Sequence, residues 1–227
     1  MKQYKLVIFD VDGTLLDTTE GIAASVRYTV DRFGFAPLSE EQLRSFIGPP
    51  IQNSFARTYG LSGPILQEIA TVFRDRYKST DLLKAVPYKG IYEVFTGLHE
   101  RNIRTAIATY KREDYAIELM RHFYFDEYTD VIHGADHENK LKKSDIIRLC
   151  MREAGADAGE TLMIGDTDND AAGAQGIGVD FLAVTFGFGY RPGERVENYP
   201  CVAMADTPLE ILDRIDGREQ IDKGETV

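Results

Sequence analysis

The chain has 227 residues, of which 43% are hydrophobic and 28% charged, and its formal net charge is −11. These proportions are ordinary for a globular protein of one large or two modest domains, and an acidic chain without a basic run is not expected to bind nucleic acid. No apolar stretch is long enough for a membrane span or a signal peptide, and Cys150 and Cys201 do not suggest a disulfide scaffold, so we expect a reducing, cytoplasmic setting.

The first predicted element is a strand over residues 5–9, where an apolar run bounded by polar residues fits a short strand buried on both faces. Asp10, Asp12, Gly13 and Thr14 follow at once. If the strand continued to Asp12, the two carboxylates would point the same way, because strand side chains alternate, and Gly13 would let the chain turn away. We therefore expect two acids at the carboxyl end of a buried strand, where open α/β sheets bind their ligands.

From residue 18 to residue 83 the sequence shows helical patterns and no convincing strand. Apolar residues recur at spacings of three and four, which predicts amphipathic helices. Ser39, with Gln42 three residues later, has the form of a capping box that opens a helix. The run Gly48-Pro49-Pro50 interrupts the helical pattern before it resumes. This stretch is therefore predicted to be a helical insertion.

After residue 86, predicted strands alternate with predicted helices, which indicates a parallel sheet with right-handed crossovers. The fold class is accordingly α/β, with a doubly wound, mostly parallel, Rossmann-like core. The loop at Gly187-Phe188-Gly189 is expected to be flexible. The strands are predicted at 105–108, 128–133, 161–164, 181–184 and 202–203, and the helices at 91–101, 112–123, 143–154, 171–175 and 207–215.

We predict two domains. Residues 1–16 and 86–227 would form the α/β core, and residues 17–85 would form the helical cap above its strand ends. The cap segment carries eight acids and eight bases, so the negative charge of the chain lies outside it. A domain inserted at this place can open and close over a site.

Four segments that carry polar side chains should meet at one edge of the sheet. They contribute Asp10 and Asp12; Thr109; Lys140, Lys142 and Lys143; and the run Gly165-Asp166-Thr167-Asp168-Asn169-Asp170. Clustered carboxylates repel one another unless a cation lies among them, and clusters of oxygen ligands suit Mg²⁺, usually beside a phosphate. A threonine at a strand end is more often a simple turn or cap, and lysines beside a loop are usually a solvated face. A Ca²⁺ loop would need a glutamate downstream, where the chain has Ala171-Ala172-Gly173-Ala174 instead.

The sequence resembles the haloacid dehalogenase-like hydrolases, and within them the phosphoglycolate phosphatase type, which has a helical cap after the first motif. The resemblance rests on Asp10-Val11-Asp12-Gly13-Thr14 and on Met163-Ile164-Gly165-Asp166-Thr167-Asp168-Asn169-Asp170, more loosely on Ala108-Thr109, and on the cap stretch Phe46-Ile47-Gly48-Pro49-Pro50.

The resemblance implies a role for each site residue. Asp10 would be the nucleophile and Asp12 the general acid and then the base. Mg²⁺ would be held by Asp10, by the main-chain carbonyl of Asp12 and by Asp166, with Asp170 as a further acid near the metal. Thr109 and one lysine would bind phosphate oxygens. The family's usual Lys-Pro pair is absent here; Lys143 is our choice because it begins a helix, and Lys140 and Lys142 stay open.

The function predicted is a Mg²⁺-dependent phosphatase that acts on a small phosphorylated metabolite, with Arg27, Arg44 and Gly48 of the cap as candidate substrate contacts. A sugar phosphomutase of the same fold is the serious alternative. A receiver-type signalling domain, a haloacid dehalogenase acting on carbon and a non-catalytic binding protein are less favoured. The physiological substrate and the choice between monomer and homodimer stay open.

Overall fold

The computed structural model describes residues 3–129, 131–136, 140–194 and 196–217. Within them, six strands form one sheet in the order β5-β4-β1-β6-β7-β8, and every neighbouring pair is parallel. β1 lies between β4 and β6, where the strand order reverses along the chain, and open α/β sheets bind ligands at such a point. The strands are β1 (Leu6–Phe9), β4 (Arg104–Arg112), β5 (Ile132–Ala135), β6 (Thr161–Gly165), β7 (Asp180–Val184) and β8 (Ala203–Ala205).

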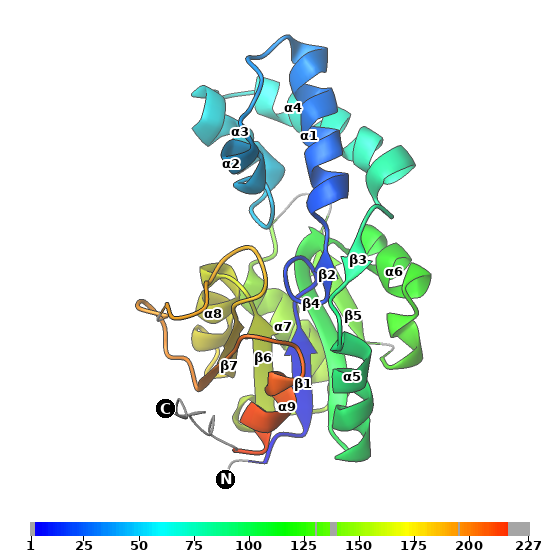
Figure 1. The fold of residues 1–227 in the computed structure, drawn as a ribbon, viewed down its shortest axis with the longest axis vertical. Coiled ribbons are helices and arrows are strands. Elements are labelled where there is room, and N and C mark those ends of the chain that lie inside the picture. Colours follow the sequence, from blue (N-terminus) through cyan, green and yellow to red (C-terminus); the bar gives the residue numbers. More distant parts are fainter. Residues whose placement is uncertain (1–2, 130, 137–139, 195, 218–227) are drawn as a thin grey trace, which may run out of the picture.

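Helices cover both faces of the sheet (Figure 1). Successive residues of β1 point to opposite faces, so Phe9 packs with Phe95 in one core cluster while Ile8 packs with Ile146 in the other. The cluster around Phe9 includes residues of α5 (Ile91–Glu100), α6 (Glu113–His122) and α9 (Glu210–Ile215). The cluster around Ile8 includes residues of α7 (Lys143–Ala154) and α8 (Asp168–Gln175). The predicted doubly wound α/β core is confirmed.

A helical insertion stands beyond the carboxyl ends of the strands (Figure 1). It comprises α1 (Thr19–Phe33), α2 (Glu40–Arg44), α3 (Ile51–Tyr59), α4 (Ile65–Arg76) and a π-helical turn over Tyr77–Asp81. The predicted capping box at Ser39 is present, since Ser39 and Gln42 each accept from the other's backbone N–H. We refer to this insertion as the cap.

Two short strands join the cap to the core. β2 (Leu16–Asp17) and β3 (Val86–Pro87) pair in antiparallel fashion, and the sequence did not predict them because two residues are too few to show a period. The expected boundaries of residues 17–85 fall at these linkers. Whether the cap behaves as a separate domain stays a prediction.

The strand before α6 is longer than expected. We predicted that it ends before Thr109, but β4 runs to Arg112, with an irregularity in its pairing to β5 between Ala108 and Arg112. β5 in turn begins at Ile132, later than predicted. The extension of β4 carries Tyr110, Lys111 and Arg112 past the sheet toward the cap, and it alters the composition of the site.

Within the described part of the chain, no helix has both the length and the apolarity that crossing a membrane requires. Both cysteines are free thiols, with Cys150 buried in the core and Cys201 partly exposed.

Candidate active site

Three carboxylates converge where β1 and β6 end. Asp10 is the first residue after β1 and Asp166 the first after β6, and the two strands are in register, with Phe9 opposite Ile164. Asp170 lies in the first turn of α8, which follows β6 directly. One oxygen each of Asp10, Asp166 and Asp170 lies within 4.8 Å of the other two, which makes this group a candidate metal site.

The electrostatics of this group favour a cation. Burial raises the pKa of Asp166 to about 8, with further contributions from the charges of Asp170 and Asp10. Burial likewise raises the pKa of Asp10 to about 6, although Lys143 opposes the shift. In the described part of the chain, Oδ1 of Asp166 is buried and has no hydrogen-bond partner. A buried orphan oxygen among repelling carboxylates fits a divalent cation with hard oxygen ligands, such as Mg²⁺.

Lys143 lies between two of these acids. Its Nζ is 2.8 Å from Oδ1 of Asp10 and 2.6 Å from Oδ1 of Asp170, and only 2% of its side chain is exposed. Burial alone would lower the pKa of Lys143, but the two carboxylates outweigh it and raise that pKa above its usual value. The backbone N–H of Lys143 donates to the Tyr110 hydroxyl at 3.0 Å, which fixes the start of α7 against β4.

The carboxylate of Asp12 faces a second lysine. Because β1 stops at Phe9, the strand alternation that we invoked does not extend to Asp12, and its partners differ from those of Asp10. Oδ1 of Asp12 accepts from the Thr18 hydroxyl at 2.6 Å, and Oδ2 is 3.1 Å from Nζ of Lys111. The same Nζ donates to the Tyr77 hydroxyl of the cap at 2.9 Å. Asp12, Lys111 and Tyr77 therefore link the core to the cap.

Sequence reasoning missed Lys111. It follows Thr109 by two residues. Because the predicted strand stopped before Thr109, Lys111 fell in a predicted turn before the next helix. The side chain of Lys111 is 6% exposed, and the charge of Asp12 outweighs burial to raise its pKa above the usual value. The backbone N–H of Lys111 also donates to the Thr109 hydroxyl at 3.2 Å. A buried cation beside the predicted general acid is a functional candidate that only the extended strand reveals.

Most of the other predicted site residues come together as well. One small pocket is lined by Asp10, Asp12, Thr109 and Lys143 of the core together with Gly48 of the cap. The other two cap candidates lie elsewhere. Arg27 is paired with Glu40 at 2.6 Å in an exposed salt bridge and borders a separate hollow on the cap. Arg44 is exposed on α2 and is not among the described residues that line the site.

The loop after β7 wraps around Asp166. The backbone N–H groups of Phe188 and Gly189 donate to Oδ2 of Asp166 at 2.7 and 3.2 Å. A Cβ at Gly187 would overlap Oδ2 of Asp166 and the carbonyl of Gly13. Gly13 itself has φ +80°, and a Cβ there would also overlap Oδ2 of Asp166. The loop at Gly187 and Gly189, which we expected to be flexible, instead packs closely and holds one carboxylate in place, while Gly13 makes the turn that was expected of it.

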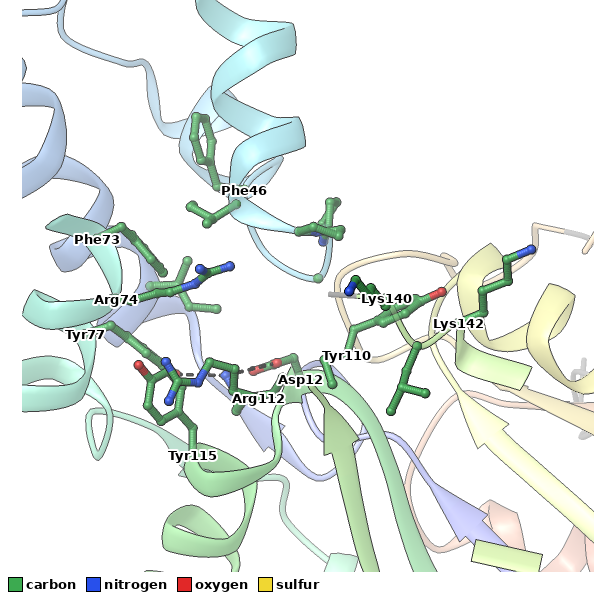
Figure 2. A pocket seen from close by; sticks show the side chains of 18 residues that line it. Asp12, Phe46, Phe73, Arg74, Tyr77, Tyr110, Arg112, Tyr115, Lys140 and Lys142 are labelled. Atoms are coloured by element: carbon green, nitrogen blue, oxygen red, sulfur yellow. Dashed lines mark hydrogen bonds and ion pairs between the residues drawn. The ribbon is translucent and has the colours of Figure 1, made fainter. Parts of the chain in front are cut away.

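A larger cavity of about 360 Å³ opens between cap and core beside the carboxylates (Figure 2). It shares Asp12, Gly48, Tyr110 and Lys111 with the small pocket, so the two spaces adjoin. Aromatic side chains from α4, the π-helical turn and α6 form one wall. The aromatic residues of this wall are Phe73, Tyr77 and Tyr115.

The profile of the haloacid dehalogenase-like hydrolase family matches residues 7–184 of this sequence. The chain belongs to this family. It is 35% identical over 188 residues to a 5'-nucleotidase of Pseudomonas aeruginosa, with 82% of this chain and 85% of that one covered. It is 31% identical to pyrophosphatase PpaX of Halalkalibacterium halodurans over 91% of this chain and 94% of the relative.

The solved structures agree with this family membership. The crystal structure of a predicted phosphatase from Clostridium acetobutylicum superposes with a TM-score of 0.88 at 29% identity, over 95% of this chain and 99% of that one. A phosphoglycolate phosphatase of Agrobacterium fabrum matches at 29% identity over 88% of both chains. The predicted resemblance to the phosphoglycolate phosphatase branch and the prediction of a hydrolase are therefore confirmed, while the relatives' own substrates differ.

Proposed function

We propose that this protein is a Mg²⁺-dependent phosphoric monoester hydrolase that works through an aspartyl-phosphate on Asp10. The observation that carries the proposal is the setting of the Asp10 carboxylate. Its Oδ1 is held by Lys143, no donor among the described residues contacts Oδ2, and Asp166 and Asp170 lie within 4.8 Å. An aspartate with one oxygen anchored and the other unengaged is oriented for attack on phosphorus.

The metal would be held by the carboxylates of Asp10 and Asp166 and by the main-chain carbonyl of Asp12, with Asp170 close by. When bound, Mg²⁺ supplies positive charge that neutralises the attacking carboxylate and the phosphate. The side chain of Asp12 does not belong to the carboxylate cluster, which fits a contribution through its backbone alone. Lys143 balances the remaining charge on Asp10 and Asp170.

The reaction would take two steps. In the first, Oδ2 of Asp10 attacks phosphorus, the bond from phosphorus to the ester oxygen breaks, and Asp12 gives its proton to the leaving alkoxide. In the second, Asp12 takes a proton from water, the water oxygen attacks phosphorus, and the bond from phosphorus to Asp10 breaks to release phosphate. Because both oxygens of Asp12 are engaged by Thr18 and Lys111 here, one of these contacts must open before the proton moves.

Thr109 and Lys143 would bind the phosphate oxygens. Thr109 is 1% exposed at the floor of the small pocket, and its hydroxyl can donate outward while it accepts from the backbone of Lys111. A hydroxyl and an ammonium that are already in position stabilise the charge of the transition state without reorganisation. A cytoplasmic location and a monomeric or dimeric state stay predictions.

The proposal is tested by phosphate release from a panel of phosphomonoesters that includes 4-nitrophenyl phosphate, with and without Mg²⁺. We expect release that depends on Mg²⁺ and falls by at least about 10⁴-fold in Asp10→Asn. The matched control is Asp31→Asn on the exposed end of α1, which should keep the wild-type rate. Undiminished activity in Asp10→Asn would exclude the nucleophile role, and isomerisation of a sugar phosphate without release would indicate the mutase alternative.

A further inference from the structure

The large cavity between cap and core is unusually basic for this protein. The chain has 37 acidic residues against 26 lysines and arginines. Among the described residues that line the cavity, in contrast, one side chain is acidic, Asp12, and five are basic: Arg74, Lys111, Arg112, Lys140 and Lys142. Reversal of the overall charge balance inside one cavity indicates an anionic ligand.

Two of these cations are already neutralised. Lys111 pairs with Asp12, and Arg112 makes a bidentate pair with Asp114 at 3.0 and 2.8 Å while its guanidinium lies 4.5 Å from the centre of the Tyr115 ring. Lys142, at the start of α7, points away from the centre of the cavity (Figure 2). None of these three groups is a free anion receptor in the present arrangement, and Lys140 likewise has an interaction of its own.

Arg74 is different. It projects from α4 into the space between cap and core (Figure 2). Its one hydrogen bond to a described residue is a long contact of 3.4 Å to the amide oxygen of Gln52, and no carboxylate in the described part of the chain pairs with it. Burial, and next the nearby charge of Arg112, lower the pKa of Arg74 below its usual value. A half-buried guanidinium that has no carboxylate partner and feels the charge of a second arginine is destabilised until an anion binds it.

The position of Arg74 defines which part of a substrate it would meet. The phosphoryl group would be held at the carboxylates, and the leaving group must extend past Asp12 into the large cavity, because the two spaces share Asp12 and Lys111. A planar guanidinium fork matches a carboxylate or a phosphate in a bidentate way. Phe73, Tyr77 and Tyr115 line the same cavity, and apolar surface beside a guanidinium strengthens its pairing with an anion.

We propose that Arg74 binds a second anionic group, a carboxylate or a phosphate, on the leaving group of the substrate, and that this contact sets the specificity of the enzyme. The inference rests on the proposed phosphatase function and narrows its substrate class to phosphomonoesters that carry a negative charge at both ends. Nucleoside monophosphates, whose leaving group is a neutral nucleoside, are then poor substrates.

The test uses substrate pairs that differ only in the second anion. The carboxylate pair is 3-phosphoglycerate and glycerol 3-phosphate, and the phosphate pair is 1,3-propanediol bisphosphate and 3-hydroxypropyl phosphate. We expect kcat/KM of the wild-type enzyme to favour the doubly anionic member of at least one pair by about 10- to 100-fold, with adenosine 5'-monophosphate among the weak substrates. The pair in which this preference appears tells whether the second anion is a carboxylate or a phosphate.

Arg74→Gln should remove this preference. We expect kcat/KM for the ester with the second anion to fall to that for its partner without it, whose own kcat/KM stays within about twofold. Arg74→Lys should recover part of the preference because it keeps the charge without the fork. The control is Arg32→Gln on the exposed end of α1, which should change neither activity. An equal loss on both members of a pair, or a wild-type enzyme without preference, would overturn the subsite.

Binding separates the failure of this inference from the failure of the proposed function. If no ester, including 4-nitrophenyl phosphate, releases phosphate, the hydrolase proposal has failed. The subsite is then judged by calorimetry with 3-phosphoglycerate, glycerol 3-phosphate and the two propanediol esters. Tighter binding of a doubly anionic ester that is lost in Arg74→Gln supports it, and equal affinities contradict it.

Discussion

The two buried lysines of the site differ in the part of the molecule that their side chains contact. Lys143 contacts carboxylates of the core, Asp10 and Asp170, and α7 brings it there regardless of the cap. Lys111 reaches from Asp12 of the core to the Tyr77 hydroxyl of the cap. The end of the site that would hold phosphate is therefore built within the core, whereas the end that would receive the leaving group is completed only when the cap lies over it.

Of the two lysines, the one within the core should have the larger effect. Lys143→Met removes the ammonium that neutralises Asp10 and Asp170, so we expect phosphate release to fall by about 10³-fold on every substrate. The loss should be as large for 4-nitrophenyl phosphate as for an alkyl phosphate, because Lys143 acts on the phosphoryl group and not on the leaving group. Steady-state rates on the two esters measure this directly.

Two observations control the Lys143 experiment. Loss of one partner of a buried ion pair can destabilise a protein by about 3 to 5 kcal/mol, so circular dichroism must first establish that Lys143→Met is folded. Lys143→Arg should keep the charge and retain more activity than Lys143→Met. A folded Lys143→Met variant within tenfold of the wild-type rate would show that this ammonium is not needed.

Replacement of Lys111, which reaches the cap, should lower kcat less than replacement of Lys143, and mainly on esters with a poor leaving group. Lys111→Met removes the contact that positions the Asp12 side chain between core and cap, and we expect about a 10²-fold lower kcat on alkyl phosphates, whose leaving alkoxide needs a well-placed acid. The nitrophenolate of 4-nitrophenyl phosphate leaves without protonation, so its release should fall by less than about tenfold. Equal losses on both esters would place Lys111 at the phosphate rather than at the leaving group.

Tyr77→Phe tests how much the cap hydroxyl contributes through Lys111. It keeps the ring, which stacks on Phe73 with the ring centres 5.7 Å apart, and removes only the hydroxyl that Lys111 contacts. We expect about a fivefold loss on alkyl phosphates and little change with 4-nitrophenyl phosphate. A loss equal to that of Lys111→Met would mean that the lysine acts mainly through the cap.

A change within the cap should affect stability rather than catalysis. Asp81 is fully buried at the end of the π-helical turn and accepts from Ser25 of α1, while Arg76 and Lys84 lie 2.9 Å from it. Burial raises the pKa of Asp81, but hydrogen bonds from Lys84, Arg76 and Ser25 outweigh it, and the net pKa lies below the usual value. We therefore expect Asp81→Asn to lower the free energy of unfolding by about 2 kcal/mol at pH 7.

The pH dependence of this effect has a definite sign. Because the pKa of Asp81 is lower in the folded than in the unfolded protein, its stabilisation is fully present above the unfolded pKa of about 3.9 and is lost as the pH falls toward the folded value. The difference between wild type and Asp81→Asn in urea unfolding should therefore shrink below about pH 4. A constant difference from pH 7 to pH 3 would contradict this role.

Much of the core could be read from the sequence because local patterns and tertiary structure agree there. The apolar run before Asp10 is a buried strand, and the predicted helix from Lys143 to Ala154 has the observed bounds. The acids at strand ends meet because parallel strands bring their carboxyl ends to one edge. These features follow from periodicity and from the chirality of the crossovers.

Several features of the site depend on tertiary contacts that no local sequence pattern encodes. The polar run of Tyr110, Lys111 and Arg112 does not read as a strand, and the contact of Lys111 with the cap becomes visible only in the folded chain. Arg74 sits beside Phe73 on an amphipathic helix, and only the docking of cap on core shows that it faces a cavity. Gly187 and Gly189 look flexible in sequence but are required by their close approach to Asp166.

The proposed mechanism requires that Asp10 becomes phosphorylated during turnover. The most direct measurement is to quench the enzyme during hydrolysis of a phosphomonoester with Mg²⁺, reduce it with borohydride, which converts an aspartyl-phosphate into homoserine, and locate the homoserine by mass spectrometry. We predict homoserine at position 10 when substrate and Mg²⁺ are both present, and none when either is left out. Homoserine at another aspartate, or steady turnover without modification of Asp10 under conditions that trap an acyl phosphate standard, would contradict the account.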